Sequence, residues 1–148
     1  KNIVSPRKNA DRDTHKVRQA AAMEFPFMGD VERIVREMQA AGSRVVLLTL
    51  AGLYVPEETP SLRAMEIGHL PPFTDNPYIL AALANNYNAR LRQLSQKTGA
   101  DLIDLAEWSK TALQPRDRNF SDSVHLEPAA SVKIGVYLAG ELAAKLPK

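Results

Sequence analysis

The chain of 148 residues contains no cysteine, which excludes disulfides, cysteine nucleophiles and thiolate metal sites. A cysteine-free protein functions in either redox environment, so this absence assigns no compartment. The longest apolar run, residues 45–55, is interrupted by Thr49 and Gly52 and is much shorter than the ~20 residues of a membrane helix. The sequence therefore predicts no membrane span. No apolar stretch follows the polar first residues, so we expect no secretory signal within the chain.

The chain also has little charge imbalance and few aromatic residues. The formal net charge is +2, the basic residues are scattered, and the aromatic residues are four Tyr, four Phe and one Trp. A nucleic-acid surface more typically shows a basic stripe interleaved with aromatic side chains, so we expect no nucleic-acid partner. The three histidines, His15, His69 and His125, are too dispersed to indicate a metal cluster. We expect neither a metal nor a cofactor.

What the chain does contain is an ordinary globular composition, 45% hydrophobic and 24% charged, which fits one domain. Residues 1–14 are polar and are expected to form a loop or a frayed chain end. Apolar side chains at helical spacing then predict a helix with Asp30 as its N-cap and Gly42 as its stop. Residues 44–50 follow as a continuous β-branched and apolar run, typical of a parallel strand that is covered on both faces.

A second helix and strand follow after a long connection. Residues 51–78 contain five prolines and leave the C-terminal end of the first predicted strand, the edge where α/β sheets place ligands. Residues 80–98 predict a helix, and residues 101–105 predict a short strand. Residues 106–121 are interpreted as a polar connection, and Pro128 suits the first turn of a last helix.

The segment that points to chemistry contains Asp122 and His125, which lie three residues apart just before that last helix. In such a turn the carboxylate can bind one imidazole nitrogen and fix the tautomer, which leaves the other nitrogen free to accept a proton from a nucleophile. Histidine suits this role because its ordinary pKa lies near neutrality. The alternative is structural: His125 packs or caps, and Asp122 is an ordinary turn residue.

The context of this pair resembles the C-terminal part of SGNH (GDSL-type) hydrolases. In that family a strand that ends in an acidic residue precedes a D-x-x-H block, and a helix closes the domain. Residues 101–105, Asp122 to His125 and the helix after Pro128 follow this order, and the Asn-Asn-Tyr-Asn run at residues 85–88 resembles the helix before the family's last strand. The resemblance covers about residues 30–146.

This resemblance implies a fold and two catalytic residues. The fold would be three-layer α/β/α with a parallel sheet, of the SGNH or flavodoxin-like kind. Residues 1–148 would be a single domain holding the C-terminal two-thirds of it, with the first strand or strands missing. His125 would be the general base that activates a serine, and Asp122 would orient it.

The family's other motifs are not clearly present. The Gly29-Asp30-Val31 run has Val31 where the family's G-D-S block has serine, so we interpret it as the start of a helix. Asn2 would be the family's oxyanion asparagine if glycine precedes Lys1; the alternative is a terminal residue without a role. Ser121 and Ser123, beside His125, are interpreted as turn residues.

The resemblance therefore predicts a serine ester hydrolase, either esterase- or lipase-like or a carbohydrate acetyl esterase. Its substrate would be a small-molecule or glycan ester, and its nucleophile would lie outside this chain, in an associated N-terminal segment. Two alternatives stay open: a non-catalytic SGNH-like domain that binds carbohydrate or protein, and a glycan O-acetyltransferase. His69, in the long connection, either reaches the site and shapes the substrate pocket or is incidental, and Trp108 is interpreted as a packing anchor.

Overall fold

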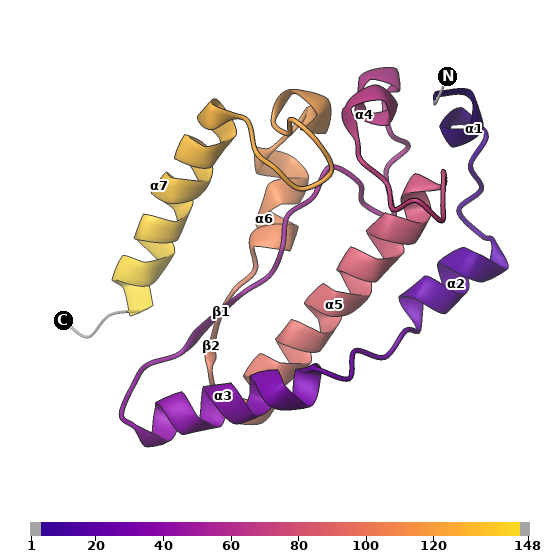
Figure 1. The fold of residues 1–148 in the computed structure, drawn as a ribbon. Coiled ribbons are helices and arrows are strands. Elements are labelled where there is room, and N and C mark those ends of the chain that lie inside the picture. Colours follow the sequence, from indigo (N-terminus) through magenta and orange to yellow (C-terminus); the bar gives the residue numbers. More distant parts are fainter. Residues whose placement is uncertain (1–3, 146–148) are drawn as a thin grey trace.

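The computed structural model describes residues 4–145 and shows an α/β protein with a small parallel sheet (Figure 1). The elements follow in the order α1 (Val4–Lys8), α2 (His15–Ala21), α3 (Met28–Ala40), β1 (Val46–Leu48), α4 (Leu62–Ile67), α5 (Pro77–Thr98), β2 (Asp101–Ile103), α6 (Leu105–Ala112), the 3-10 helix η1 (Arg116–Arg118) and α7 (Pro128–Lys145). In Figure 1 the two strands run between α7 on one side and the α3 and α5 helices on the other.

The sheet consists of β1 and β2, which pair in parallel with Leu47 opposite Leu102. Parallel neighbours need a crossover, and α5 provides it. The pairing extends one residue beyond β1, because the amide of Thr49 donates to the carbonyl of Ile103 at 3.2 Å. Among the described residues β1 pairs with β2 alone, so its other edge is open.

The predicted helix stops are confirmed by the backbone. Gly42 and Gly99 have φ of 83° and 71°, the left-handed region that favours glycine after a helix. Helix α5 begins earlier than predicted, at Pro77, because Asn76 caps it by accepting a hydrogen bond from the amide of Tyr78 at 2.9 Å. The expected helix over residues 80–98 is otherwise confirmed.

Two predictions about the N-terminal half of the chain are wrong. Asp30 is not an N-cap: α3 begins at Met28, which packs into the cluster around Val35 and so extends the helix at its start. Asp30 lies in the first turn and pairs with Arg33 at 3.3 Å. The expected loop over residues 1–14 contains the short helix α1.

The expected polar connection over residues 106–121 contains α6 and η1. Helix α6 starts directly after the second strand because the Asp104 carboxylate caps it, accepting from the amide of Glu107 at 3.2 Å. A single acidic residue at the strand end thus serves as the helix cap, which shortens the predicted strand to β2.

The core of the described residues has three clusters, one of which, Ala20 with Ile79 and Ala82, joins α2 to α5. On the α3 and α5 side, Val35, Leu94 and Ala100 pack with Val45 and Leu47. A larger cluster lies beyond the C-terminal ends of the strands and holds residues of α4, α5, α6 and α7: Leu53, Tyr54, Ala64, Ala81, Leu105, Leu113, Phe120, Ala130 and Ile134. It joins the long connection to the last helix, so the segments around the predicted site share one core.

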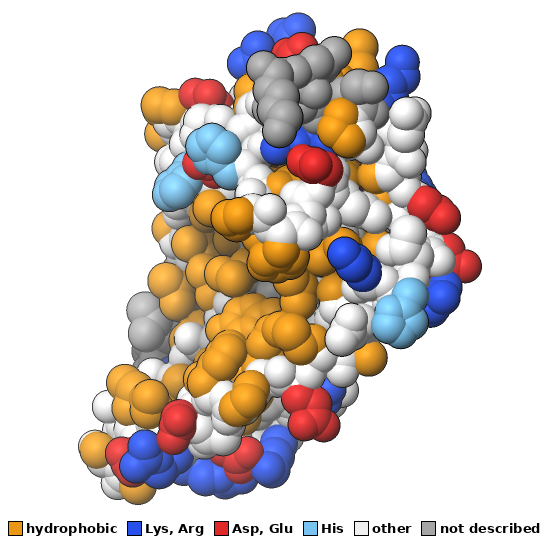
Figure 2. All heavy atoms as spheres, turned by 45° about the vertical axis from the view of Figure 1, so that its right-hand side comes forward, with side chains coloured by type: hydrophobic (Ala, Val, Ile, Leu, Met, Phe, Trp, Pro, Cys, Tyr) orange, Lys and Arg blue, Asp and Glu red, His pale blue; other side chains and the backbone are white. Residues whose placement is uncertain are grey.

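The predicted coverage of the first strand on both faces is wrong for the described residues. Leu48 is 37% exposed and Leu50, which follows β1, is 54% exposed. Apolar side chains are also exposed elsewhere: Phe27, Ile34 and Met38 around α3, and Val132, Val136 and Leu142 on α7. Figure 2 shows a band of hydrophobic side chains on one face, with histidine side chains at its upper end. No helix of the described residues is long and apolar enough to cross a membrane.

Candidate active site

The Asp122 to His125 segment is a closed turn at the start of α7. Phe120 and Leu126 form an antiparallel bridge at its base. Within the turn, the amide of Ser121 donates to the carbonyl of His125 at 2.9 Å. The backbone is therefore fixed on both sides of the two predicted catalytic residues.

Asp122 and His125 are in direct contact, as the sequence predicts. Asp122 Oδ2 lies 2.6 Å from His125 Nδ1, while Asp122 Oδ1 accepts from the amides of His125 and Val124, both at 2.8 Å. The amides of His125 and Val124 and then the imidazole hold the pKa of the Asp122 carboxyl well below its usual range. The carboxylate is therefore ionised across the neutral range.

The charge of Asp122 determines how the imidazole is presented. A carboxylate beside Nδ1 favours the tautomer with the proton on Nδ1, which leaves Nε2 as an acceptor. The Asp122 side chain is 18% exposed and the His125 side chain is 76% exposed. The pair thus combines a sheltered carboxylate with an open imidazole, the arrangement that a general base needs.

Ser123 fastens this turn to the long connection after β1. Its side chain is buried, and its hydroxyl donates to the carbonyl of His69. The Ser123 carbonyl accepts from the amide of Leu53 at 3.0 Å. The Ser121 hydroxyl also donates to a backbone carbonyl, that of His125 at 3.3 Å. Both serines of the turn therefore hold the backbone, as expected of turn residues.

The long connection brings His69 to the same place. His69 Nδ1 lies 3.8 Å from Asp122 Oδ2, the oxygen that also contacts His125 Nδ1. The His69 side chain is 87% exposed. The structure therefore places the His69 ring beside the Asp122 and His125 pair, and its part in a substrate pocket stays a prediction.

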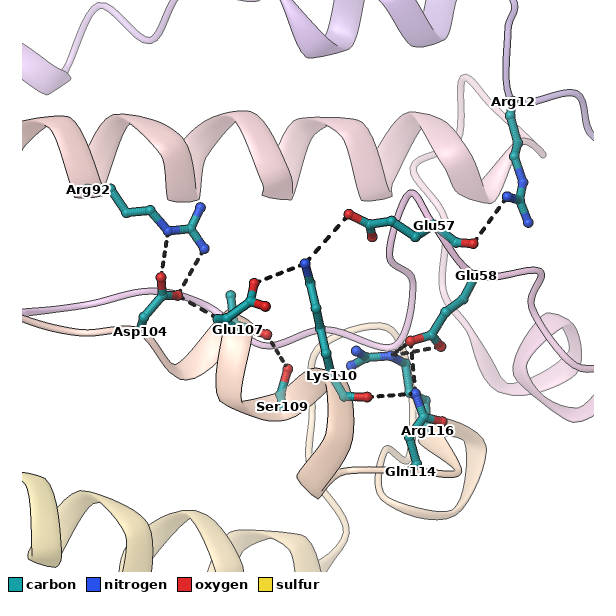
Figure 3. Close-up of polar contacts among 11 residues, drawn as sticks. Arg12, Glu57, Glu58, Arg92, Asp104, Glu107, Ser109, Lys110, Gln114 and Arg116 are labelled. Carbon is teal, nitrogen blue, oxygen red and sulfur yellow. Dashed lines mark hydrogen bonds and ion pairs between the residues drawn. The ribbon is translucent and has the colours of Figure 1, made fainter.

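The long connection is itself anchored by charged residues that the sequence analysis missed (Figure 3). Arg116, whose side chain is 4% exposed, pairs with Glu58 at 3.1 Å and donates to the carbonyl of Gly52 at 3.1 Å. Lys110 pairs with Glu57 at 3.6 Å. Because Gly52 precedes Leu53, Arg116 supports the segment that holds Ser123. An arginine in a polar stretch carries no sequence signal that would separate it from a surface residue.

A second missed group lies at the strand ends. Thr49 is fully buried, and its hydroxyl donates to Asp104 at 2.8 Å and accepts from the amide of Ala106 at 2.9 Å. Arg92 binds the same carboxylate through two nitrogens, at 2.6 and 2.9 Å, and is the main reason that the pKa of Asp104 is lowered. Asn88 bonds both the amide and the carbonyl of Leu50, at 2.8 and 2.9 Å. These contacts fix where the long connection departs from β1.

Trp108, interpreted as a packing anchor, stacks on Tyr137 with ring centroids 4.4 Å apart and planes 7° from parallel. The contact joins α6 to α7.

A hollow of about 110 Å³ lies between α5 and α6 and is lined in part by Asn85, Arg92 and Glu107. None of the residues that line it belongs to the turn that holds Asp122 and His125. The charged residues of this hollow are already paired: Lys110 pairs with Glu57 and Glu107, and Arg92 pairs with Asp104. We therefore assign that hollow no part in the site.

Two further expectations concern Asn2 and metals. Asn2, the candidate oxyanion residue, lies outside the described residues. Within residues 4–145 no group of three or more His, Asp or Glu side chains is arranged to hold a metal ion.

No protein-family model, no curated protein and no solved structure matches this chain. The comparisons therefore assign it to no family.

Proposed function

We propose that this chain carries the acid and base residues of a serine ester hydrolase of the SGNH type. The observation that supports the proposal most is the 2.6 Å contact between Asp122 Oδ2 and His125 Nδ1, beside an imidazole that is open to solvent. A turn that needed this histidine only for packing would bury the ring. Here the backbone is held firmly while the reactive nitrogen remains accessible.

The proposed reaction is acyl transfer to a serine and then to water. A serine hydroxyl attacks the ester carbonyl while His125 Nε2 takes its proton, and the Asp122 carboxylate stabilises the imidazolium that forms. His125 then gives this proton to the departing alcohol, and the acyl-serine remains. In the second half, His125 takes a proton from water, the hydroxide attacks the acyl-serine, and the acid is released as the serine regains its proton.

The nucleophile is proposed to come from polypeptide outside these residues. The hydroxyls of Ser121 and Ser123 both bind backbone carbonyls, so neither is placed as the attacking group. A further strand beside the open edge of β1 would cover Leu48 and Leu50 and would end near the same edge of the sheet as the turn. A serine that follows such a strand would complete the site and a three-layer fold.

Hydrolysis of p-nitrophenyl acetate tests this proposal. A preparation that contains the proposed serine-bearing segment together with residues 1–148 should hydrolyse the ester, and residues 1–148 alone should not. His125→Ala should lower kcat by a factor of about 10³ or more, because the base is lost. His15→Ala, an exposed histidine at the start of α2, is the matched control and should leave kcat unchanged. Undiminished hydrolysis by His125→Ala would refute the proposal.

A further inference from the structure

The backbone at His69 is held by three side chains from different parts of the chain. The Ser123 hydroxyl donates to the His69 carbonyl, and Arg7 Nη1 donates to the carbonyl of Gly68 at 2.7 Å. Gly68 also lies tightly against Tyr54, since a Cβ at that position would be 1.9 Å from the Tyr54 hydroxyl oxygen. The place of His69 is therefore set by α1, by the segment after β1 and by the turn before α7.

The imidazole of His69 is, by contrast, open. Its side chain is 87% exposed, and its Nδ1 lies 3.8 Å from Asp122 Oδ2. A fixed backbone that carries an open polar side chain next to a candidate base is suited to contact a molecule that arrives from solvent. Packing does not explain the position of this ring.

The charge of Asp122 also lies on the Nδ1 side of the His69 ring, at a distance of 3.8 Å that is longer than a hydrogen bond. A carboxylate near Nδ1 favours the proton on that nitrogen, so Nε2 becomes an acceptor. Asp122 thus faces the Nδ1 atoms of both His69 and His125 through the same oxygen. The site presents two neighbouring acceptor nitrogens, of which only that of His125 is needed to activate the serine.

We propose that His69 Nε2 accepts a hydrogen bond from a free hydroxyl on the alcohol part of the ester. His69 would then be a specificity-determining residue, and the substrate class would be esters of polyhydroxy alcohols, such as partly acetylated sugars. A simple alkyl or aryl ester has no such hydroxyl and gains nothing from this contact. The inference rests on the proposed hydrolase function.

The test compares the hydrolysis of two esters by a preparation that contains both residues 1–148 and the proposed serine-bearing segment. His69→Ala should lower kcat/KM for glycerol monoacetate about fivefold, mainly through KM, because one neutral hydrogen bond is lost. It should lower kcat/KM for p-nitrophenyl acetate much less, because this ester has no free hydroxyl. His69→Gln, which keeps a side-chain acceptor, should recover part of the loss, and His15→Ala should change neither ester. Equal losses on both esters, or no loss on either, would overturn the proposal.

A second measurement separates this inference from the hydrolase proposal. Nitrogen-15 spectra of the imidazoles are simple because the chain has three histidines. His69 should show the Nδ1-protonated tautomer and should shift on addition of glycerol but not of propan-1-ol at the same concentration. A response to glycerol in a protein that no fluorophosphonate labels would support the contact and contradict hydrolysis. Labelling without any response of His69 would overturn the contact alone.

Discussion

Asp122 binds His125 twice, accepting the backbone amide on Oδ1 at 2.8 Å and contacting the ring Nδ1 through Oδ2 at 2.6 Å. One carboxylate thus fixes both the main chain and the imidazole of the same residue. The geometry of the candidate base therefore depends on the ionisation of Asp122, which leads to the first prediction.

The turn should loosen in acid. The pKa of Asp122 is lowered in the folded protein, so its stabilising effect is present above the unfolded value of about 4 and is lost as the pH falls below it. Hydrogen exchange of the Val124 and His125 amides should accelerate in that range, beyond the change of intrinsic rate. Asp122→Asn is the control and should show no such acid step. An acid step that persists in Asp122→Asn would assign it to another group.

Ser123 and Ser121 should differ in their effect on stability, although both hydroxyls bond to backbone carbonyls. Ser123 is buried, so Ser123→Ala leaves the His69 carbonyl without this partner and should lower the free energy of unfolding by about 1–2 kcal/mol. Ser121 is exposed, and Ser121→Ala should cost less than about 0.5 kcal/mol. Urea unfolding measures both. Equal costs would show that the Ser123 contact does not anchor the turn.

Gly68 should not tolerate a side chain. In Gly68→Ala the new methyl group would collide with the Tyr54 hydroxyl, 1.9 Å away, and with its bond to the carbonyl of Ala64. Overpacking of this kind should lower the free energy of unfolding by about 2 kcal/mol. Gly140 in α7 has nothing within 4 Å of such a methyl, so Gly140→Ala should be neutral or stabilise the helix by up to about 1 kcal/mol. Thermal unfolding separates the two variants. A fully stable Gly68→Ala protein would contradict the tight contact.

Thr49 should be needed for its hydroxyl. Thr49→Val keeps the shape of the side chain but removes the acceptor for the Ala106 amide and the donor to Asp104, which should cost about 1–3 kcal/mol. Thr49→Ser retains the hydroxyl and should cost less, because only a methyl group is lost. The midpoints of urea unfolding for Thr49→Val and Thr49→Ser measure the two costs. If valine were tolerated better than serine, packing and not hydrogen bonding would explain the residue.

The sequence predicts those parts of the fold that depend on local signals. Gly42 and Gly99 end their helices where expected, since a left-handed residue after a helix favours glycine. The contact between Asp122 and His125 follows from a spacing of three residues within one turn. In each case residues close together in the sequence were sufficient to predict the local structure.

Other features depend on contacts that are distant in the chain. The sequence predicted a strand over residues 101–105, whereas the role of Asp104 as a helix cap, with Thr49 and Arg92, requires residues brought together by folding. The burial of Arg116 depends on Glu58 and Gly52, which lie in another segment. The exposure of Leu50 depends on which elements cover the residues after β1, and periodicity within one strand does not reveal this.

The most direct test of the central claim is labelling with a fluorophosphonate probe, followed by mass spectrometry of residues 1–148 and of every polypeptide that purifies with them. We predict an adduct on a serine of the proposed serine-bearing segment, outside residues 1–148, that disappears in His125→Ala and persists in His15→Ala. An adduct on Ser121 or Ser123, or one that survives the loss of His125, would contradict the assignment of His125 as the base.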